Sequence, residues 1–468
     1  MIPSEREVVE NLTLLIDLYQ LTMAATYFAE GMTAPATFSF FVREYPADRA
    51  YLVAAGIEDV LRYLESFRFT DDSLRHLRRT GLYRDDFLDY LEQLRFSGDV
   101  WAFPEGSICF VPEPLLEVTA PIIEAQLVET YLINQVNLQT MIATKAARCV
   151  HAAQGRDLVD FSLRRTQGSD AGMKVARASY ITGFRGSSNV LAEKRYGIPA
   201  FGTMAHSYVE SFTDEVEAFR AFARQFPTNS TLLVDTYDTP SGLRKAARVG
   251  KEMAARGEQL SGVRLDSGDL FELSHAARRI LDNAGLVGVK VFASGGLNEY
   301  KVADLVERGA PVDAFGVGTD MGVSGDAPWL DCAYKLVEYA GRPRLKLSAH
   351  KETLVGRKQV WRAWDGDGKF EADLLALRHE GAETIAAQLG GAGGHIEPQL
   401  LPVMHNGRIT QPLPTLDAIR GRFAAEFRRL PVAYKALRGA AQYPVRISSA
   451  LQREQAATAA ALRARTEF

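Results

Sequence analysis

Between residues 157 and 317 the chain alternates short apolar segments with longer amphipathic ones. The apolar segments have the length and composition of strands and lie at 157–161, 200–203, 231–235, 261–265, 289–293 and 314–317. Helical patterns separate them, at 170–183, 187–196, 241–256, 269–285 and 298–309. Strands that alternate with helices of this length form parallel βαβ units. The repeat therefore predicts an α/β fold, here an irregular or incomplete α/β barrel.

A mixed pattern flanks this repeat on both sides. Before it, the sequence predicts a helix at 13–30, a helical pair at 56–94, a long helix at 122–152, and strands at 36–42, 99–103, 107–111 and 115–119. Beyond residue 331, strands are expected again at 333–338, 344–347 and 359–364, then a flexible glycine-rich loop at 389–394 and helices from about residue 414. Because the late strands resemble the early ones, we expect both to belong to one discontinuous domain.

Composition excludes several classes of protein. The 468 residues carry a formal net charge of -4, which argues against a general nucleic-acid-binding surface. The three cysteines, Cys109, Cys149 and Cys332, are far apart and form no CxxC pair, which is typical of a reducing compartment. The N-terminus shows no signal-peptide pattern, and no apolar run is long enough to span a membrane. We therefore expect a cytoplasmic protein with no membrane partner.

Polar residues gather where the predicted strands end. His206 follows segment 200–203, Asp266 and Asp269 follow segment 261–265, and Arg164 and Arg165 follow segment 157–161. On a βα scaffold the carboxyl ends of the strands carry the chemistry. A histidine, a carboxylate pair and arginines at these ends predict an anionic, phosphate-bearing substrate.

Two glycine-containing segments follow the last two predicted strands. Ser294, Gly295 and Gly296 follow one, and Gly318 and Thr319 follow the other. Glycines at such ends let backbone N–H groups approach phosphate oxygens, and in barrels the loops after the last strands commonly bind phosphate. The alternative is a pair of tight turns that need a positive φ.

The charged residues at the strand ends also have two interpretations. Asp266 and Asp269 could hold Mg²⁺ through water or accept hydrogen bonds from ribose hydroxyls. Alternatively, Asp266 or Ser267 caps the following helix, and Asp269 adds a favourable negative charge at its N-terminus. Arg164 and Arg165 could clamp a phosphate, with one of them facing away if they lie on a strand, or form surface ion pairs.

For one histidine and one tyrosine, the local sequence alone does not favour a functional role. His206 has the basicity of a nucleophile or general base, although a lone histidine is more often a structural hydrogen-bonding group. On pattern alone, Tyr19 is a partly buried helix residue.

Eight ordered motifs together resemble the nicotinate phosphoribosyltransferase family. They lie at 17–23, 116–148, 160–165, 186–192, 202–206, 265–269, 316–319 and 346–361. The resemblance implies a type II phosphoribosyltransferase fold, with an irregular α/β barrel and a discontinuous α/β-sandwich domain. It implies the condensation of nicotinate with phosphoribosyl pyrophosphate (PRPP), coupled to ATP hydrolysis and using Mg²⁺, in the first step of NAD salvage from nicotinate. It also implies a homodimer with shared active sites.

The resemblance assigns roles residue by residue. His206 matches the histidine that ATP phosphorylates, and Tyr19, Thr203 and Arg264 match positions that contact nicotinate. Thr319 matches a contact to PRPP, and further phosphate contacts are expected at Arg165, Ser294, Gly295, Gly296 and Gly318. Asp266 and Asp269 remain candidates for the metal or the ribose.

The expected domains are residues 1–121 and 331–400 for the sandwich, 122–330 for the barrel with the active site, and 401–468 for a C-terminal helical extension. A nicotinamide phosphoribosyltransferase is the nearest alternative, although the Arg164–Arg165 pair and Leu265 before Asp266 favour the nicotinate enzyme. A quinolinate phosphoribosyltransferase and a non-catalytic nucleotide-binding protein are further alternatives.

Overall fold

The computed structural model describes residues 11–347, 353–389 and 395–466, and its largest sheet joins both ends of the chain. This seven-stranded sheet has the order β13-β12-β1-β5-β3-β17-β18, and its neighbouring strands are antiparallel. The strands are β1 (Pro35–Val42), β3 (Asp99–Ala102), β5 (Pro114–Pro121), β12 (Cys332–Tyr339), β13 (Arg342–Pro343), β17 (Leu401–His405) and β18 (Arg408–Ile409). Strands from beyond residue 331 therefore pair with strands from before residue 122, as expected for one discontinuous domain. The exact domain boundaries stay a prediction.

The second sheet is parallel throughout and carries the repeat between residues 157 and 317. Its order is β7-β6-β11-β10-β9-β8. The strands are β6 (Asp157–Asp160), β7 (Gly186–Ser187), β8 (Thr231–Leu233), β9 (Gly262–Leu265), β10 (Lys290–Ala293) and β11 (Ala314–Val317). Among the described residues β7 and β8 do not pair with each other, so the barrel is incomplete.

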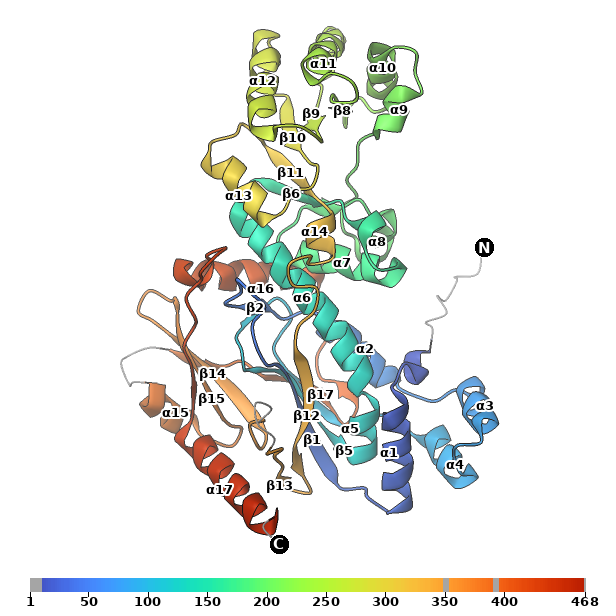
Figure 1. Cartoon of the computed structure of the whole chain (residues 1–468), viewed down its shortest axis with the longest axis vertical. Helices are drawn as coiled ribbons and strands as arrows, with labels where there is room; N and C mark the ends of the chain where they lie inside the picture. Colours follow the sequence, from blue (N-terminus) through green and yellow to red (C-terminus); the bar gives the residue numbers. More distant parts are fainter. Residues whose placement is uncertain (1–10, 348–352, 390–394, 467–468) are drawn as a thin grey trace.

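Helices connect the parallel strands, and α10, α11 and α12 stand next to one another at the top of Figure 1. The helices of this part are α7 (Ser169–Ile181), α8 (Val190–Tyr196), α9 (His206–Glu210), α10 (Glu215–Gln225), α11 (Thr239–Ala254), α12 (Leu270–Asn283), α13 (Glu299–Glu307) and α14 (Thr319–Gly322). Each strand-to-helix connection brings a short polar segment to the same edge of the sheet, because the carboxyl ends of parallel strands point one way.

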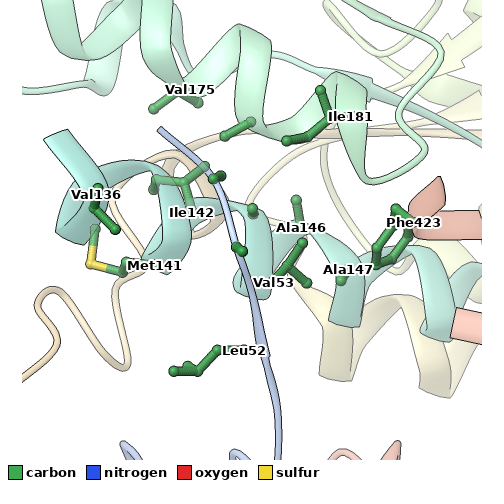
Figure 2. Close-up of a cluster of buried hydrophobic side chains, with 14 of the residues drawn as sticks. Leu52, Val53, Val136, Met141, Ile142, Ala146, Ala147, Val175, Ile181 and Phe423 are labelled. Carbon is green, nitrogen blue, oxygen red and sulfur yellow. The ribbon is translucent and has the colours of Figure 1, made fainter. Parts of the chain in front are cut away.

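Helix α6 (Glu129–Ala153) links the two halves of the molecule (Figure 1). At 25 residues it is about 37 Å long, and it packs against α7 and α13. Figure 2 shows its apolar side chains beside those of α7, of β2 (Leu52–Val53) and of α16 (Leu416–Arg429). Buried charged residues of α6, such as Lys145 and Arg148, therefore lie next to apolar side chains, where unpaired charge is costly.

The remaining elements include a four-stranded sheet in the order β16-β14-β15-β19 and the strand β4, which pairs with β2 in a two-stranded sheet. They are α1 (Leu18–Ala29), α2 (Ile57–Ser66), α3 (Asp71–Thr80), α4 (Asp85–Gln93), β4 (Ile108–Cys109), α5 (Ile122–Leu127), β14 (Lys358–Trp364), β15 (Phe370–Leu377), α15 (Ala382–Leu389), β16 (Ile396–Pro398), β19 (Val445–Ile447) and α17 (Ser449–Thr466). In the part of the chain that the structure describes, no helix is both long and apolar enough to cross a membrane.

Several helix predictions were wrong in their limits. Residues 56–94 form three helices, because Gly81 in the left-handed conformation ends α3 and Thr70 caps its start. The first helix begins only at Leu18, after a capping box formed by Asp17 and Gln20. The long helix predicted at 122–152 is interrupted at Val128, between α5 and α6.

Four further predictions need correction. Residues 200–203 form only a single bridge, from Ala200 to Ser187, so His206 follows no strand and instead begins α9. Helix α8 starts at Val190, because the Asn189 side chain caps it. Residues 344–347 are not a strand. The segment 401–468 is not purely helical, since β17 and β18 extend the largest sheet and β19 pairs with β15. Of the predicted loop at 389–394, residues 390–394 lie outside the described residues.

Candidate active site

The candidate site lies at the carboxyl edge of the parallel sheet. β9, β10 and β11 are neighbours, and their pairing places Leu265 beside Ala293 and Ala293 beside Phe315. The residues that follow these strands therefore meet at one edge. Asp266, Ser294 and Gly318 come from three different strand ends, as the sequence pattern predicts.

Arg264, near the end of β9, is the centre of a hydrogen-bond network. Its Nε donates to Ser294 Oγ at 2.8 Å, and its Nη2 donates to Asp266 Oδ1 at 2.6 Å. Its Nη1 donates to Thr203 Oγ1 at 3.2 Å and to the Met204 carbonyl oxygen at 3.4 Å. All three of its nitrogens thus donate to acceptors of this chain, and among the described residues at least one N–H, on Nη2, has no acceptor.

The Asp266 carboxylate is shared between these partners. Besides Arg264, it accepts a hydrogen bond from Ser294 Oγ at 2.5 Å. Partial burial acts to raise the pKa of Asp266, but the Ser294 hydrogen bond and the Arg264 charge outweigh burial and hold this pKa below its ordinary value. Asp266 is therefore ionised near neutral pH.

His206 lies beside this carboxylate at the first turn of α9. Its Nε2 is 3.8 Å from Asp266 Oδ2, and its Nδ1 is within hydrogen-bond distance, 3.2 Å, of Thr236 Oγ1. The imidazole is 40% exposed, so one edge of the ring is open to a reactant. A partly exposed histidine held between a hydroxyl and a carboxylate has the setting of a nucleophile or a proton carrier.

Ser294, Gly295 and Gly296 form a turn after β10, here called the serine–glycine loop. Gly295 has a φ of +95°, and a Cβ at this position would lie 1.8 Å from the Asp266 carbonyl oxygen. Gly296 also has a positive φ, and its carbonyl oxygen accepts from Lys301 Nζ at 2.8 Å. The positive φ values agree with the tight-turn interpretation. The two glycines also have no side chains that could block a phosphate from the backbone N–H groups, so phosphate binding remains possible.

After β11, Gly318, Thr319 and Asp320 form a second segment, here called the α14 turn. Gly318 precedes the helix, and Thr319 is its exposed first residue. Within the described residues the Thr319 hydroxyl has no hydrogen-bond partner of its own, so it is available to a ligand.

Family models match three parts of the chain in order. They are the nicotinate phosphoribosyltransferase N-terminal domain at residues 14–137, the nicotinate phosphoribosyltransferase family at 157–340, and the C-terminal domain at 391–455. A nicotinate phosphoribosyltransferase of Mycobacterium tuberculosis is 48% identical over 445 residues, which cover 95% of this chain and 93% of the relative. The chain belongs to the nicotinate phosphoribosyltransferase family.

Further relatives and solved structures agree with this. The nicotinate phosphoribosyltransferase of Bacillus subtilis is 43% identical, covering 79% of this chain and 77% of its own length. The crystal structure of human nicotinic acid phosphoribosyltransferase has a TM-score of 0.83 at 31% identity, over 94% of this chain and 99% of that one. The nicotinate-nucleotide pyrophosphorylase of Pyrococcus furiosus has a TM-score of 0.72 at 26% identity, over 90% and 96%. These likenesses confirm the type II phosphoribosyltransferase fold.

Most of the residues predicted for this nicotinate phosphoribosyltransferase site lie together. Thr203, His206, Arg264, Asp266 and Ser294 are linked by the contacts above. Gly295, Gly296, Gly318 and Thr319 follow the neighbouring strands.

Asp269 and Arg165 stand apart from this network. Asp269 caps α12, because its Oδ1 accepts from the backbone N–H groups of Phe271 and Glu272 at 3.1 and 3.2 Å. The sequence predicted Asp266 or Ser267 as the possible cap, so the capping alternative named the wrong residue. Arg165 lies in a short 3₁₀ helix (Leu163–Arg165) and not on a strand. Its exposed side chain has no hydrogen-bond or ion-pair partner among the described residues.

Tyr19 lies away from the other predicted residues, on α1 in the lower half of Figure 1, whereas α9 lies in the upper half. Its side chain is 47% exposed, and partial burial and the carboxylate of Glu129 raise the pKa of its hydroxyl to about 12. Within one chain, Tyr19 therefore does not reach His206.

Sequence reasoning missed three residues of this site. Asp235 follows β8 and accepts from the Asp266 backbone N–H at 2.9 Å and from Ser267 Oγ at 2.6 Å, while Thr236 contacts His206. The ring centroid of Phe161 lies 5.2 Å from the Arg264 guanidinium carbon. The signal was present, since Asp235 follows an apolar strand as Asp266 does, but the predicted strand 231–235 included it.

Two carboxylates could serve a magnesium ion. Asp235 Oδ1 is buried and has no hydrogen-bond partner among the described residues, and Asp266 Oδ2 lies 3.8 Å from His206 Nε2. Mg²⁺ is commonly held by one or two carboxylates together with substrate phosphates and waters. The described residues contain no cluster of three or more histidine, cysteine or acidic residues able to hold a metal ion alone. The donor set thus fits a metal that arrives with a phosphorylated substrate.

Proposed function

We propose that this chain condenses nicotinate with PRPP, giving nicotinate mononucleotide and pyrophosphate, and that this reaction is coupled to ATP. It would be the first step of NAD salvage from nicotinate. The observation that carries the proposal is the network in which Arg264 joins Thr203, Ser294 and Asp266 beside His206. The names of the relatives support the same assignment.

Nicotinate would be recognised by charge and by shape. Arg264 supplies a cation and one N–H that is not directed at its own chain, which suits the carboxylate of the acid better than a neutral amide. The Phe161 ring beside the guanidinium offers an aromatic face to the pyridine ring. Thr203, held by Arg264 Nη1, adds a hydroxyl close to the same carboxylate.

PRPP would bind across the neighbouring strand ends. The serine–glycine loop and the α14 turn expose backbone N–H groups and the Thr319 hydroxyl to the phosphates, and Arg165 has its guanidinium free among the described residues. The bond from the ribosyl carbon to pyrophosphate would break with its electron pair going to the pyrophosphate oxygen, and the pyridine nitrogen of nicotinate would form the new bond to that carbon. The leaving pyrophosphate gains negative charge and therefore needs compensating cations. Mg²⁺, held at Asp266 and Asp235 with the phosphates, would supply this charge. Asp269, although it caps α12, stays a candidate for the ribose hydroxyls or the metal.

ATP coupling would run through His206. An imidazole nitrogen attacks the γ-phosphorus of ATP, the bond to the β-phosphate oxygen breaks, and ADP leaves while the phosphoryl group stays on the histidine. The imidazole proton can pass to solvent or to Asp266, whose Oδ2 lies 3.8 Å from Nε2. A phosphohistidine would place negative charge beside the site and alter the affinity for anionic ligands. Attack of water on the phosphorus would then break the N–P bond, release inorganic phosphate and restore the imidazole for the next turnover.

The proposal includes a homodimer in which each site is shared. Tyr19 is half exposed on α1 and too distant from His206 of its own chain, so its ring would meet the pyridine in the site of a second copy. The exposed apolar residues Leu15 and Leu18 beside Tyr19 support an interface at this surface.

The decisive experiment measures pyrophosphate release from PRPP with nicotinate or nicotinamide, each with and without ATP. We expect release with nicotinate, stimulated by ATP, and little with nicotinamide. Preferential turnover of the amide would make the chain a nicotinamide phosphoribosyltransferase. Absence of release with either substrate would leave a non-catalytic nucleotide-binding protein.

A further inference from the structure

Lys145 of α6 is a fully buried cation surrounded by three carboxylates. Its Nζ lies 2.7 Å from Glu299 Oε2, 3.1 Å from Asp320 Oδ2 and 2.8 Å from Asp326 Oδ1. Its side chain has no exposed surface. Burial acts to lower the pKa of Lys145, but Glu299 and Asp326 more than offset this, and the pKa is raised above its ordinary value. The ammonium is therefore charged at neutral pH.

The carboxylates around Lys145 lie in or close to the two phosphate-binding candidates. Glu299 is the first residue of α13 and follows Gly296 of the serine–glycine loop by three positions. Asp320 belongs to the α14 turn and directly follows Thr319. Asp326 lies in the segment that leads away from α14. One ammonium group thus ties together the connections after β10 and β11.

The network is closed on its other side by two arginines. Arg49 Nη2 donates to both oxygens of Asp326 at 3.0 Å, and Arg148 Nε donates to Glu299 Oε1 at 3.0 Å. Three cations thus face three carboxylates in a largely buried cluster. Removing one partner from such a cluster leaves uncompensated charge, so the geometry around Lys145 has few alternatives.

We infer that Lys145 is a positioning residue, which fixes the spacing between the serine–glycine loop and the α14 turn so that both contact the phosphates of one PRPP molecule. Lys145 is buried and does not touch the substrate. It acts through Glu299 and Asp320, whose backbones continue those of Gly296 and Thr319. This inference rests on the proposed function, because it assumes that PRPP binds between these two segments.

The test uses two variants that alter the same ion pair to different degrees. Lys145→Met removes the ammonium and keeps a similar length. Asp320→Asn keeps the shape of a residue whose side chain is 32% exposed, and it weakens only the attraction to Lys145, so it is expected to fold even if Lys145→Met does not. For each variant, KM and kcat are measured with PRPP and with nicotinate, and PRPP binding is measured by calorimetry without nicotinate.

The matched control is Arg177→Met. Arg177 is also a buried cation between carboxylates, with Nη2 at 2.8 Å from Glu58 and 2.6 Å from Glu105, but neither partner adjoins the serine–glycine loop or the α14 turn. Both methionine variants should lose stability. Only the Lys145 variant should lose affinity for PRPP selectively.

We expect Lys145→Met to raise the KM and the Kd for PRPP at least about ten-fold, while the KM for nicotinate changes less than about two-fold. Asp320→Asn should give a smaller increase of the same kind, and the double variant should be no worse than Lys145→Met alone. An unchanged PRPP Kd in both single variants would overturn the inference, as would a loss shared equally by PRPP, nicotinate and the Arg177 control. A wild-type chain that binds PRPP but turns over neither pyridine would instead contradict the proposed function.

Discussion

The Arg264 guanidinium and the Asp266 carboxylate, two residues apart at the end of β9, form an ion pair with Nη2 and Oδ1 2.6 Å apart. Under the proposed function, a substrate carboxylate would approach a cation that is already partly neutralised by its own chain. The ion pair and the hydrogen bond to Ser294 fix the orientation of the planar guanidinium, and among the described residues one N–H on Nη2 has no acceptor.

Arg264 should discriminate the acid from the amide. Arg264→Ala should lower kcat/KM for nicotinate about ten- to a hundred-fold, because a hydrogen bond to a charged group contributes roughly 1.5–3 kcal/mol. Any activity with nicotinamide should hardly change. Arg264→Lys should recover only part of the loss, since lysine keeps the charge but not the fixed donors to Thr203 and Ser294. Equal losses with acid and amide would assign Arg264 to phosphate binding or to structure.

His206 should accept a phosphoryl group from ATP. Incubation with γ-labelled ATP should give a label that is labile in acid and stable in base, and His206→Ala should not be labelled. Thr236→Val should reduce the label, because it removes the hydroxyl that lies 3.2 Å from Nδ1. Ser207→Ala is the control, since it removes a neighbouring exposed hydroxyl that does not contact the ring. Full labelling of His206→Ala would exclude this residue as the acceptor.

Gly295 should tolerate no side chain. Gly295→Ala places a Cβ where the Asp266 carbonyl oxygen already lies, at 1.8 Å, in a residue with a φ of +95°. Gly197→Ala is the matched control, because Gly197 has a φ of +70° and no atom within 4 Å of such a Cβ. The control should lose about 1–2 kcal/mol of unfolding free energy from the left-handed conformation alone, and Gly295→Ala should lose clearly more. If both variants lose the same unfolding free energy in urea, the ends of β9 and β10 can move apart at little cost, and the close approach of Gly295 to Asp266 is not required.

The Asp266 carboxylate should stabilise the fold only while it is ionised. Because the pKa of Asp266 in the folded chain lies below the unfolded value of about 3.9, its contribution is complete above that value and disappears as the pH falls through the folded pKa. Asp266→Asn should therefore be less stable than the wild type near pH 7, and the difference should shrink below about pH 4. Asp72→Asn, at an exposed position, controls for the loss of one negative charge. A difference that stays constant with pH would contradict this linkage.

The sequence predicted the parallel sheet, because the period of a strand–helix repeat is a local property of the chain. Strand-end position placed Asp266 and Ser294 at one edge of the sheet, where the structure has them within hydrogen-bond distance. Thr203 and Arg264 were assigned only by the family resemblance, and their roles stay a prediction. The sequence could not predict that Asp269 would be the residue that caps α12, because several polar residues in this segment could serve as the cap. Nor could it predict Lys145, because a lysine in an apolar helix gives no sign of the three carboxylates that surround it, from segments more than 150 residues away.

The last prediction concerns the contribution of a second copy to the site. If Tyr19 serves the site of the partner, mixing inactive Tyr19→Ala chains with inactive His206→Ala chains should restore activity, because a hybrid dimer holds one site in which both residues are intact. Random exchange of equal amounts makes about half of the dimers hybrid, so about a quarter of the wild-type activity should return. Each variant mixed with itself is the control, and mass spectrometry of the intact dimers verifies the exchange. If hybrid dimers form and remain inactive, Tyr19 acts in the site of its own chain or in none, and the half-exposed ring on α1 needs another explanation.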